Sequence, residues 1–460
     1  MSNFSIRKIL GVLYFITIIL YIIELFWYSK QLYLIISSFA FILLIFAYFF
    51  TTKSNKIIVF LLLFAGTLIF IYNKLPLSEF IYGFGNNVNI IALFLAVPFL
   101  STIISVGGYL QAIKQQLLNQ TNKLKNLPYI LSGFLSNCLS IIFNIGSMPI
   151  VNKIAEESFN SFKKKKLALT LMRSSAAVAF WSPYYVGVGL VLSIYELSWL
   201  DIGWITILIA VSYLLISLFF LKQLNFVDDI ENERVNNSNT ITDKSASNKV
   251  IYLLIWTAVL LIISFLLDYY LPINMLNSVS IVSMILPIIW SISIKVFKTY
   301  MKHVRKLILN SFDQSKNEII IFISAGYFGV ALSNTDVGHS IADIIINISF
   351  GSIYIMSIIL VFFTMLLSFC GIHPVIVAIG LGSSLSPELF GVNSIYMAVI
   401  LLISMGLGYN ISPFSAITLM TSNLTGVSPI NIVKINSVYI LLSAFILPLL
   451  LYLVFIFLYK

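Results

Sequence analysis

Charged side chains are scarce in this chain, and so are cysteine and histidine. Asp, Glu, Lys and Arg make up 10% of the 460 residues, whereas a typical soluble domain carries roughly 25%. Two cysteines and three histidines are too few for a disulfide framework or a histidine-based metal site. The chain also lacks the H-E-x-x-H and G-x-S-x-G motifs and any pair of carboxylates within one apolar run. We therefore expect no enzymatic activity and no cofactor.

Apolar residues make up 60% of the chain and occur in long runs. Residues 9–28, ILGVLYFITIILYIIELFWY, have about the length that an α-helix needs to cross a bilayer. Further runs fall at 32–50, 57–73, 88–110, 129–151, 167–195, 203–222, 250–270, 277–297, 318–333, 350–383, 394–424 and 436–459. This pattern predicts an all-α polytopic protein in a lipid bilayer, with about eleven transmembrane helices.

The net charge of +10 comes mainly from short basic stretches between the apolar runs, the densest at 163–166 and 295–306. Lys and Arg confined to short loops mark the cytoplasmic side of inner-membrane proteins, so we expect no nucleic-acid partner. With Arg7 and Lys8 inside, this rule predicts a multi-pass protein of the bacterial inner membrane with a cytoplasmic N-terminus. The connection at 196–202 would then lie outside.

Residues 129–151 do not fit a simple crossing. The segment is barely one span long, and its middle, SNCLSIIFNIGS, is polar. A crossing there would also carry the four lysines at 163–166 to the outside, against the rule for basic loops. We therefore predict a re-entrant hairpin that enters and leaves on the cytoplasmic side.

Two short motifs recur at matching distances. Leu-Ser-x-Cys ends at Cys138 and again at Cys370, 232 residues later, and a Ser-Pro pair inside an apolar run begins at Ser182 and again at Ser412, 230 residues later. Two motifs that repeat at nearly one offset, about half the chain length, indicate an internal duplication.

The duplication predicts a division of the chain. It gives an extra N-terminal helix (1–30), a first repeat (31–225), a cytoplasmic linker (226–249) and a second repeat (250–460). Each repeat would hold a hairpin, at 129–151 or 350–383, and then a broken helix, at 167–195 or 394–424. A hairpin does not cross the membrane, so five crossings per repeat would give the second repeat the opposite orientation, as in many secondary transporters.

The Ser-Pro pairs predict interrupted helices. Proline lacks an N–H and clashes with the carbonyl four residues earlier. In the membrane, the freed backbone groups are tolerated only where protein buries them or where they line a cavity. The N–H end of a half-helix suits an anion, and the C=O end can coordinate Na⁺. A simple proline kink is the alternative.

With these features the chain resembles the ion transporter superfamily, best known from the divalent anion/sodium symporters, over roughly residues 30–460. In that family Ser-Asn-Thr at each hairpin tip helps bind Na⁺ and substrate carboxylates. Here the first tip reads Ser136-Asn137-Cys138, and the second reads Ser368-Phe369-Cys370, without the Asn. The resemblance implies eleven spans, two re-entrant hairpins, two broken helices and a homodimer.

The hairpins and breaks supply the candidate site residues. For an anionic substrate these are Asn137, Asn144, Ser182, Ser412, Thr418 and His373. For a coupling cation, with Na⁺ as the candidate ion, these are Ser136, Asn137, Ser182, Ser368, Ser412 and Asn423.

Each of these residues also has a structural interpretation. Asn side chains join packed membrane helices, and Ser and Thr bond local carbonyls. His373 could hydrogen-bond substrate, carry a proton or stabilise the turn of its hairpin. Arg173 could pair with an anionic substrate or extend to the cytoplasmic surface beside the lysines.

The leading functional hypothesis is a secondary active transporter of a small organic anion of the carboxylate type, coupled to Na⁺ or H⁺. The hairpins and broken helices would move as one body against a scaffold, in an elevator-like manner. A membrane-embedded polysaccharide polymerase or ligase is one alternative, although such enzymes usually carry Arg, His or Asp in a large external loop. An exporter or antiporter of the same superfamily is another, although no acidic residue lies in either hairpin.

Overall fold

The protein is almost entirely helical, as the sequence predicts. The computed structural model describes residues 3–118, 127–159, 161–221, 224, 229, 231–233, 244–333, 335 and 337–459. The first half contains α1 (Asn3–Glu24), α2 (Lys30–Phe50), α3 (Lys53–Tyr72), α4 (Leu77–Gly83), α5 (Val88–Val106), α6 (Tyr109–Leu118), α7 (Leu127–Phe143), η1 (Asn144–Gly146), α8 (Ser147–Ser158), α9 (Lys164–Ala176), α10 (Val178–Trp181), α11 (Val186–Ile194) and α12 (Trp199–Phe220). The second half contains α13 (Lys244–Tyr270), α14 (Met275–Ser293), α15 (Phe297–Ser333), α16 (Val337–Ser349), α17 (Ile353–Phe369), α18 (Pro374–Ser384), η3 (Pro387–Phe390), α19 (Ser394–Ile411), α20 (Ala416–Thr425) and α21 (Pro429–Tyr459).

Within the described residues, ten helical segments are long and apolar enough to cross a membrane. They are Ile6–Glu24, Lys30–Phe50, Asn55–Tyr72, Leu77–Val106, Lys164–Ile194, Trp199–Phe220, Asn248–Tyr270, Met275–Ser293, Ser394–Thr425 and Pro429–Phe457. The end of α16 and α17 meet the same test together but bend by 119° between them, which gives up to eleven spans. The polytopic all-α fold class is therefore confirmed.

One long helix replaces a predicted loop and span. Residues 295–306 were expected to connect two crossings, but from Phe297 onwards they begin α15, which continues for 37 residues to Ser333. No proline interrupts this segment, and its first glycine is Gly326. Tyr300 and Val304 are buried while the basic side chains around them stay exposed, and this amphipathic pattern sustains a helix.

A pair of short helices joined by a turn lies at each of the two places where the sequence predicts a re-entrant hairpin. α7 and α8 pack against each other and turn at Asn144, whose φ is +50°. α17 and α18 turn between Phe369 and Pro374, where Gly371 has a φ of +100°, a conformation that glycine adopts without strain. The lengths of 17 and 12 residues for α7 and α8 fall short of the roughly 20 that a crossing requires. The first hairpin runs from Leu127 to Ser158, longer than the predicted 129–151.

The two predicted broken helices are also present, and the duplication is visible in the element boundaries. Helix α9 starts at Lys164 and α19 at Ser394, α11 at Val186 and α20 at Ala416, and α12 at Trp199 and α21 at Pro429. Each pair of starts is 230 residues apart, the same offset as the Ser-Pro pairs. The equal offset supports an internal duplication.

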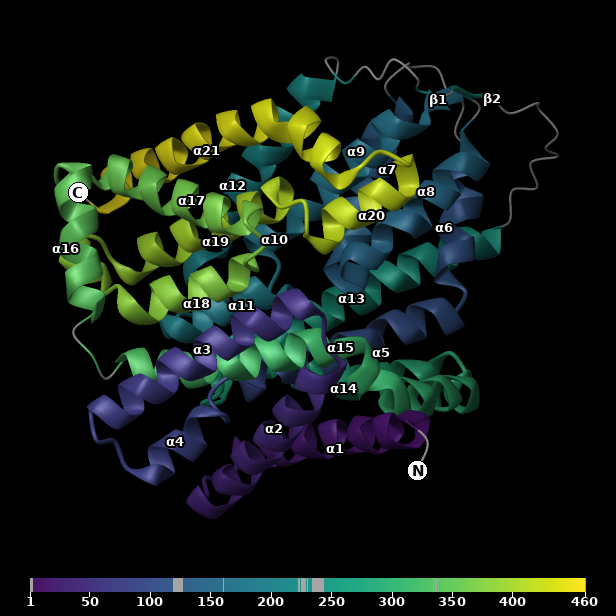
Figure 1. Ribbon diagram of the computed structural model, residues 1–460. Helices are drawn as coiled ribbons and strands as arrows, with labels where there is room; N and C mark the ends of the chain where they lie inside the picture. The colour runs from purple at the N-terminus through teal and green to yellow at the C-terminus, as the bar shows by residue number, and fades with distance from the viewer. Residues whose placement is uncertain are drawn as a thin grey trace.

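The helices pack as two groups (Figure 1). The first, here called the scaffold bundle, consists of α1–α6 and α13–α15, with α15 packed on α1, α2, α3 and α5 and α14 packed on α5. The second, the hairpin bundle, consists of α7–α12 and α16–α21, with α7 packed on α9, α17 on α19, and α21 on α12 and α19. The two bundles meet where α18 lies on α15, α11 on α14 and α5, and α7 on α5.

The two ends of the chain lie at opposite ends of the helices. In Figure 1 the amino terminus is on the right, the side of α6 and the strand pair, and the carboxyl terminus is on the left beside α16.

Part of the linker folds against the start of α9. Strand β2 (Glu231–Glu233) pairs antiparallel with β1 (Ser161–Lys163). The two carboxylate oxygens of Asp229 accept from the backbone N–H groups of Lys165 and Lys166, at 2.8 and 3.0 Å. Such capping of free helix N–H groups typically contributes about 1 kcal/mol. Most of the predicted 226–249 linker, including 226–228, 230 and 234–243, lies outside the described residues.

Candidate transport site

The first break separates α10 from α11 at Ser182 and Pro183. The N–H of Ser182 still bonds the carbonyl of Val178 at 3.0 Å, and the helix then stops because Ser182 has an extended backbone (φ −75°, ψ 124°). Pro183 offers no N–H to the preceding turn. The Ser182 hydroxyl oxygen accepts from the N–H of Tyr184 at 3.3 Å, and the Ser182 carbonyl accepts from Tyr185 at 2.9 Å. The serine thus satisfies the backbone that the proline disrupts.

The second break, between α19 and α20, repeats this arrangement bond for bond. The N–H of Ser412 bonds the carbonyl of Gly408 at 3.2 Å, and Ser412 is extended (φ −79°, ψ 121°). Its hydroxyl oxygen accepts from Phe414 N–H at 3.4 Å, and its carbonyl accepts from Ser415 N–H at 3.3 Å. Ser182 and Ser412, both predicted as site residues, therefore have the same structural role at the two breaks.

The two breaks differ in which half-helix end is satisfied. At the first break the Trp199 indole N–H donates to the carbonyl of Trp181 at 2.7 Å, while Tyr185, the residue before α11, forms no side-chain cap. At the second, the Ser415 hydroxyl oxygen caps α20 by accepting from Thr418 N–H at 3.3 Å. No donor in the described part of the chain reaches the carbonyl of Ile411. The two breaks therefore differ in two side-chain bonds: an indole N–H satisfies the carbonyl of Trp181 at the first break, and a serine hydroxyl caps the N-terminus of α20 at the second.

An aromatic cluster joins the two breaks to the tip of the second hairpin. The rings of Tyr185 and Tyr409 are 5.7 Å apart, and those of Tyr409 and His373 are 5.5 Å apart. The Phe414 ring lies 3.4 Å from where a β-carbon on Gly371 would stand. His373 keeps a buried Nδ1 without a partner. Both breaks and the tip of the second hairpin therefore meet around Tyr409.

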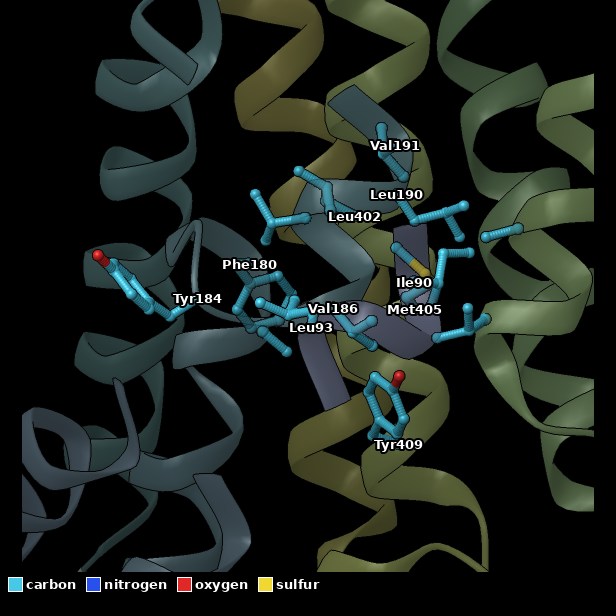
Figure 2. Close-up of a cluster of buried hydrophobic side chains, with 14 of the residues drawn as sticks. Ile90, Leu93, Phe180, Tyr184, Val186, Leu190, Val191, Leu402, Met405 and Tyr409 are labelled. Atoms are coloured by element: carbon cyan, nitrogen blue, oxygen red, sulfur yellow. The ribbon is translucent and has the colours of Figure 1, made fainter. Parts of the chain in front are cut away.

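Apolar side chains enclose the breaks on the other side. Figure 2 shows Val186 and Leu190 of α11 packed with Met405 of α19 and with Ile90 and Leu93 of α5. Polar backbone groups at the breaks therefore sit in a low-dielectric environment, where interactions with ions are stronger than in water.

Tyr184 points away from that cluster (Figure 2). Its hydroxyl bonds the hydroxyl of Ser264 at 2.7 Å and donates to the carbonyl of Leu260 at 3.2 Å. Both partners lie on α13, in the scaffold bundle. The first break is therefore tied across the boundary between the two bundles.

A cluster of buried hydroxyl groups lies beneath the first hairpin. The Ser136 and Ser175 hydroxyls are 2.7 Å apart, those of Ser140 and Ser147 are 2.6 Å apart, and those of Ser147 and Ser175 are 3.4 Å apart. All four are at most 5% exposed. They join α7, α8 and α9, and Asn137 adds a bond from Nδ2 to the Ser174 carbonyl at 2.9 Å. We call Ser136, Ser140, Ser147 and Ser175 the serine cluster.

Sequence reasoning named Ser136 and Asn137 but missed the other three serines of this cluster. Ser136 and Ser140 are spaced to share one face of a helix, and that spacing was the available signal. Ser147 and Ser175 join them only through the packing of three separate helices.

The remaining predicted residues lie on several elements of the hairpin bundle. Asn144 forms the first tip, which contacts α20, the second half of the other broken helix. Ser368 is buried beside Gly408 and donates to the Thr364 carbonyl at 2.7 Å. Thr418 lies at the start of α20 and accepts from the Ser415 hydroxyl at 2.9 Å. Asn423 is exposed near the end of α20, two helical turns from the break, and does not join the others.

Arg173 is not at the surface. It is 1% exposed, and its Nε donates to Asn436 Oδ1 on α21 at 2.8 Å. The expectation that it extends to the cytoplasmic surface is therefore wrong, because Asn436 and Tyr439 of α21 hold its guanidinium inside the hairpin bundle.

Comparison with known proteins gives one family. A solved structure, the YdaH transporter of Alcanivorax borkumensis, is similar with 11% sequence identity and a TM-score of 0.43, covering 79% of this chain and 84% of that chain. No curated protein matches significantly. The model of a family described as "Tripartite ATP-independent periplasmic transporter, DctM component" matches residues 158–459, a different family from the divalent anion/sodium symporters. Because the matched region is well over half of the chain and contains both broken helices and the second hairpin, this protein belongs to the DctM family of transporter components.

Proposed function

We propose that this protein is the membrane pathway of a secondary active transporter for a small organic anion of the carboxylate type, coupled to Na⁺ or H⁺. The observation that carries the proposal is the pair of matching breaks, with an uncapped helix N-terminus at the first and the open carbonyl of Ile411 at the second. Membership of an ATP-independent transporter family supports ion coupling over ATP hydrolysis. The same membership speaks against the polysaccharide enzyme alternative.

The substrate anion fits the first break. The N-terminus of α11 has no side-chain cap, and the partial positive charge of a helix N-terminus favours a carboxylate. Tyr185 and Tyr409 line this side of the break. His373, with its unpartnered Nδ1, is placed to bond a substrate oxygen or to carry a proton.

The cation fits the second break and the serine cluster. Na⁺ binds oxygen ligands, and unwound backbone carbonyls at broken helices supply them in secondary transporters. The open carbonyl of Ile411 and the hydroxyl of Ser412 are such ligands at the break. Ser136 and Ser175, with the amide oxygen of Asn137, offer a second group of oxygens under the first hairpin.

The division into two bundles supports an elevator-like movement. Each break or hairpin tip contacts an element of the other repeat, since α11 lies on α18 and α20 lies on η1 and α8. The hairpin bundle therefore holds together as one body. Its movement past the scaffold bundle would break the Tyr184 bonds to α13. The family description names a tripartite assembly, so we propose that partner components deliver the substrate. A homodimer remains a prediction of the resemblance.

Uptake measurements test the proposed function. We expect cells that express the chain with its partner components to accumulate a ¹⁴C-labelled carboxylate from a panel of acetate, pyruvate, succinate and citrate. Uptake should collapse when the Na⁺ and H⁺ gradients are both removed, and ATP depletion at a maintained gradient should leave it intact. Uptake that needs ATP, or that persists without either gradient, would rule the proposal out.

The opposite orientation of the two repeats gives a separate prediction. Four exposed positions, Lys164, Glu196, Glu388 and Ser428, are each changed to cysteine after Cys138 and Cys370 are changed to serine. We expect a membrane-impermeant maleimide to label Glu196→Cys and Glu388→Cys in intact cells. Lys164→Cys and Ser428→Cys should react only after the membrane is opened. Glu196 and Ser428 follow equivalent half-helices, so labelling of both from one side would refute an inverted duplication.

A further inference from the structure

A buried arginine in the hairpin bundle lacks a counter-charge. Arg173, on α9, is 1% exposed, and Asn436, on α21, is fully buried. The guanidinium is held by the bond from Nε to Asn436 Oδ1 at 2.8 Å and by the ring of Tyr439, whose centroid is 4.1 Å from the guanidinium carbon. No carboxylate among the described residues pairs with Arg173.

Hydrogen-bond donors at this place are also unused. Arg173 Nη1 and Asn436 Nδ2 are both buried and have no partner within the described structure. Twelve buried side-chain atoms lack partners in the described residues, and these two belong to side chains that are bonded to each other.

This arrangement is unfavourable without an acceptor. Burying an unpaired charge is costly even after relaxation, and each buried donor without an acceptor adds to that cost. The contact with the Tyr439 ring offsets only part of it. Charged side chains inside membrane helices are expected to have a partner, and here the missing partner must be negatively charged and must accept hydrogen bonds.

We propose that Arg173 and Asn436 bind a small inorganic anion of the halide class, with chloride as the physiological ion. Arg173 Nη1–H and Asn436 Nδ2–H both donate to it, and its charge neutralises the guanidinium. The burial of both side chains favours a monatomic ion over an organic one. The site joins α9 to α21 and is separate from the two breaks, so it is a resident ion site of the hairpin bundle and does not depend on the proposed transport function.

Thermal unfolding of the purified full-length protein tests the proposal. Unfolding midpoints are compared in sodium chloride and in sodium gluconate at equal ionic strength, with sodium acetate as a third salt. A ligand that binds only the folded state stabilises it, so chloride should raise the midpoint by roughly 2–4 °C relative to gluconate. Binding of ³⁶Cl⁻ should saturate at one ion per chain. Equal midpoints in chloride and gluconate would overturn the proposal, and so would stabilisation by acetate alone, which would indicate a carboxylate site.

Two variants identify the site. Asn436→Asp places a carboxylate beside Arg173, so it should unfold at the same midpoint in chloride and gluconate and should bind no ³⁶Cl⁻. Arg173→Met should also lose the chloride effect, and if it does not fold, Asn436→Asp alone decides. The matched control is Arg305→Met, at an exposed arginine on α15, which should keep the full chloride shift. A chloride shift of normal size in Asn436→Asp would exclude this pair of residues.

Discussion

Replacing Ser412 and Pro413 together by alanine is expected to reduce carboxylate uptake at least 100-fold while the protein still folds. The Pro413→Ala change supplies the N–H that proline lacks, so the carbonyl of Tyr409 regains a helix donor. The Ser412→Ala change removes the hydroxyl that accepts from Phe414 and favours a helical backbone. Closing the break would then remove the open carbonyl of Ile411 as a ligand of the proposed cation. A 100-fold loss corresponds to about 2.7 kcal/mol of lost interaction.

The control variant changes a serine and a proline that lie in continuous helices. Ser404 is buried in α19 and bonds only the carbonyl of Ile400 in its own helix, and Pro448 lies inside α21. We expect the Ser404→Ala, Pro448→Ala double variant to transport within twofold of the wild type. Initial uptake rates at equal amounts of membrane-inserted protein give the comparison. Undiminished uptake by the Ser412→Ala, Pro413→Ala variant would remove the second break from the mechanism.

Changing Ser175 to alanine is expected to weaken Na⁺ binding about tenfold or more. Ser175 is the hydroxyl that both Ser136 and Ser147 approach, so its loss leaves Ser136 without a side-chain partner and removes one oxygen from the cluster. One lost oxygen contact of about 1.4 kcal/mol corresponds to a tenfold change in affinity. The measurement is the Na⁺ concentration that gives half of the maximal thermal stabilisation, with choline replacing Na⁺ at constant ionic strength.

Ser217, a buried serine on α12, provides the comparison for this variant. Ser217→Ala removes a hydroxyl of equal size outside the serine cluster, and we expect its Na⁺ dependence to equal that of the wild type. A wild-type Na⁺ dependence in Ser175→Ala would show that the serine cluster only packs the first hairpin against α9.

The interruptions and hairpins could be predicted from the sequence because their causes are local. A proline removes one N–H wherever it stands, yet Pro98, Pro287 and Pro448 lie inside continuous helices. The recurrence of Ser-Pro inside apolar runs at one offset was therefore the signal that placed both breaks. The charge of the loops was sufficient to recognise the first hairpin, since a full crossing would have moved the lysines at 163–166 to the wrong side.

The remaining features depend on contacts between distant segments. Ser147 and Ser175 become part of one cluster only when α8 and α9 pack together. The position of Arg173 near the lysines favoured a surface location, and only its packing against α21 makes it buried. The many basic residues at the start of α15 suggest a loop when only their number is considered. They lie on the exposed face of a helix whose other face buries Tyr300 and Val304.

The difference between the breaks follows from two pairs of equivalent positions. Trp199 and Pro429 each begin the helix that follows their broken helix, but only the tryptophan has a side-chain N–H to give to a carbonyl. Tyr185 and Ser415 each precede a half-helix, but only the serine caps it. Neither half could therefore be exchanged for a copy of the other without changing the groups that the breaks leave open.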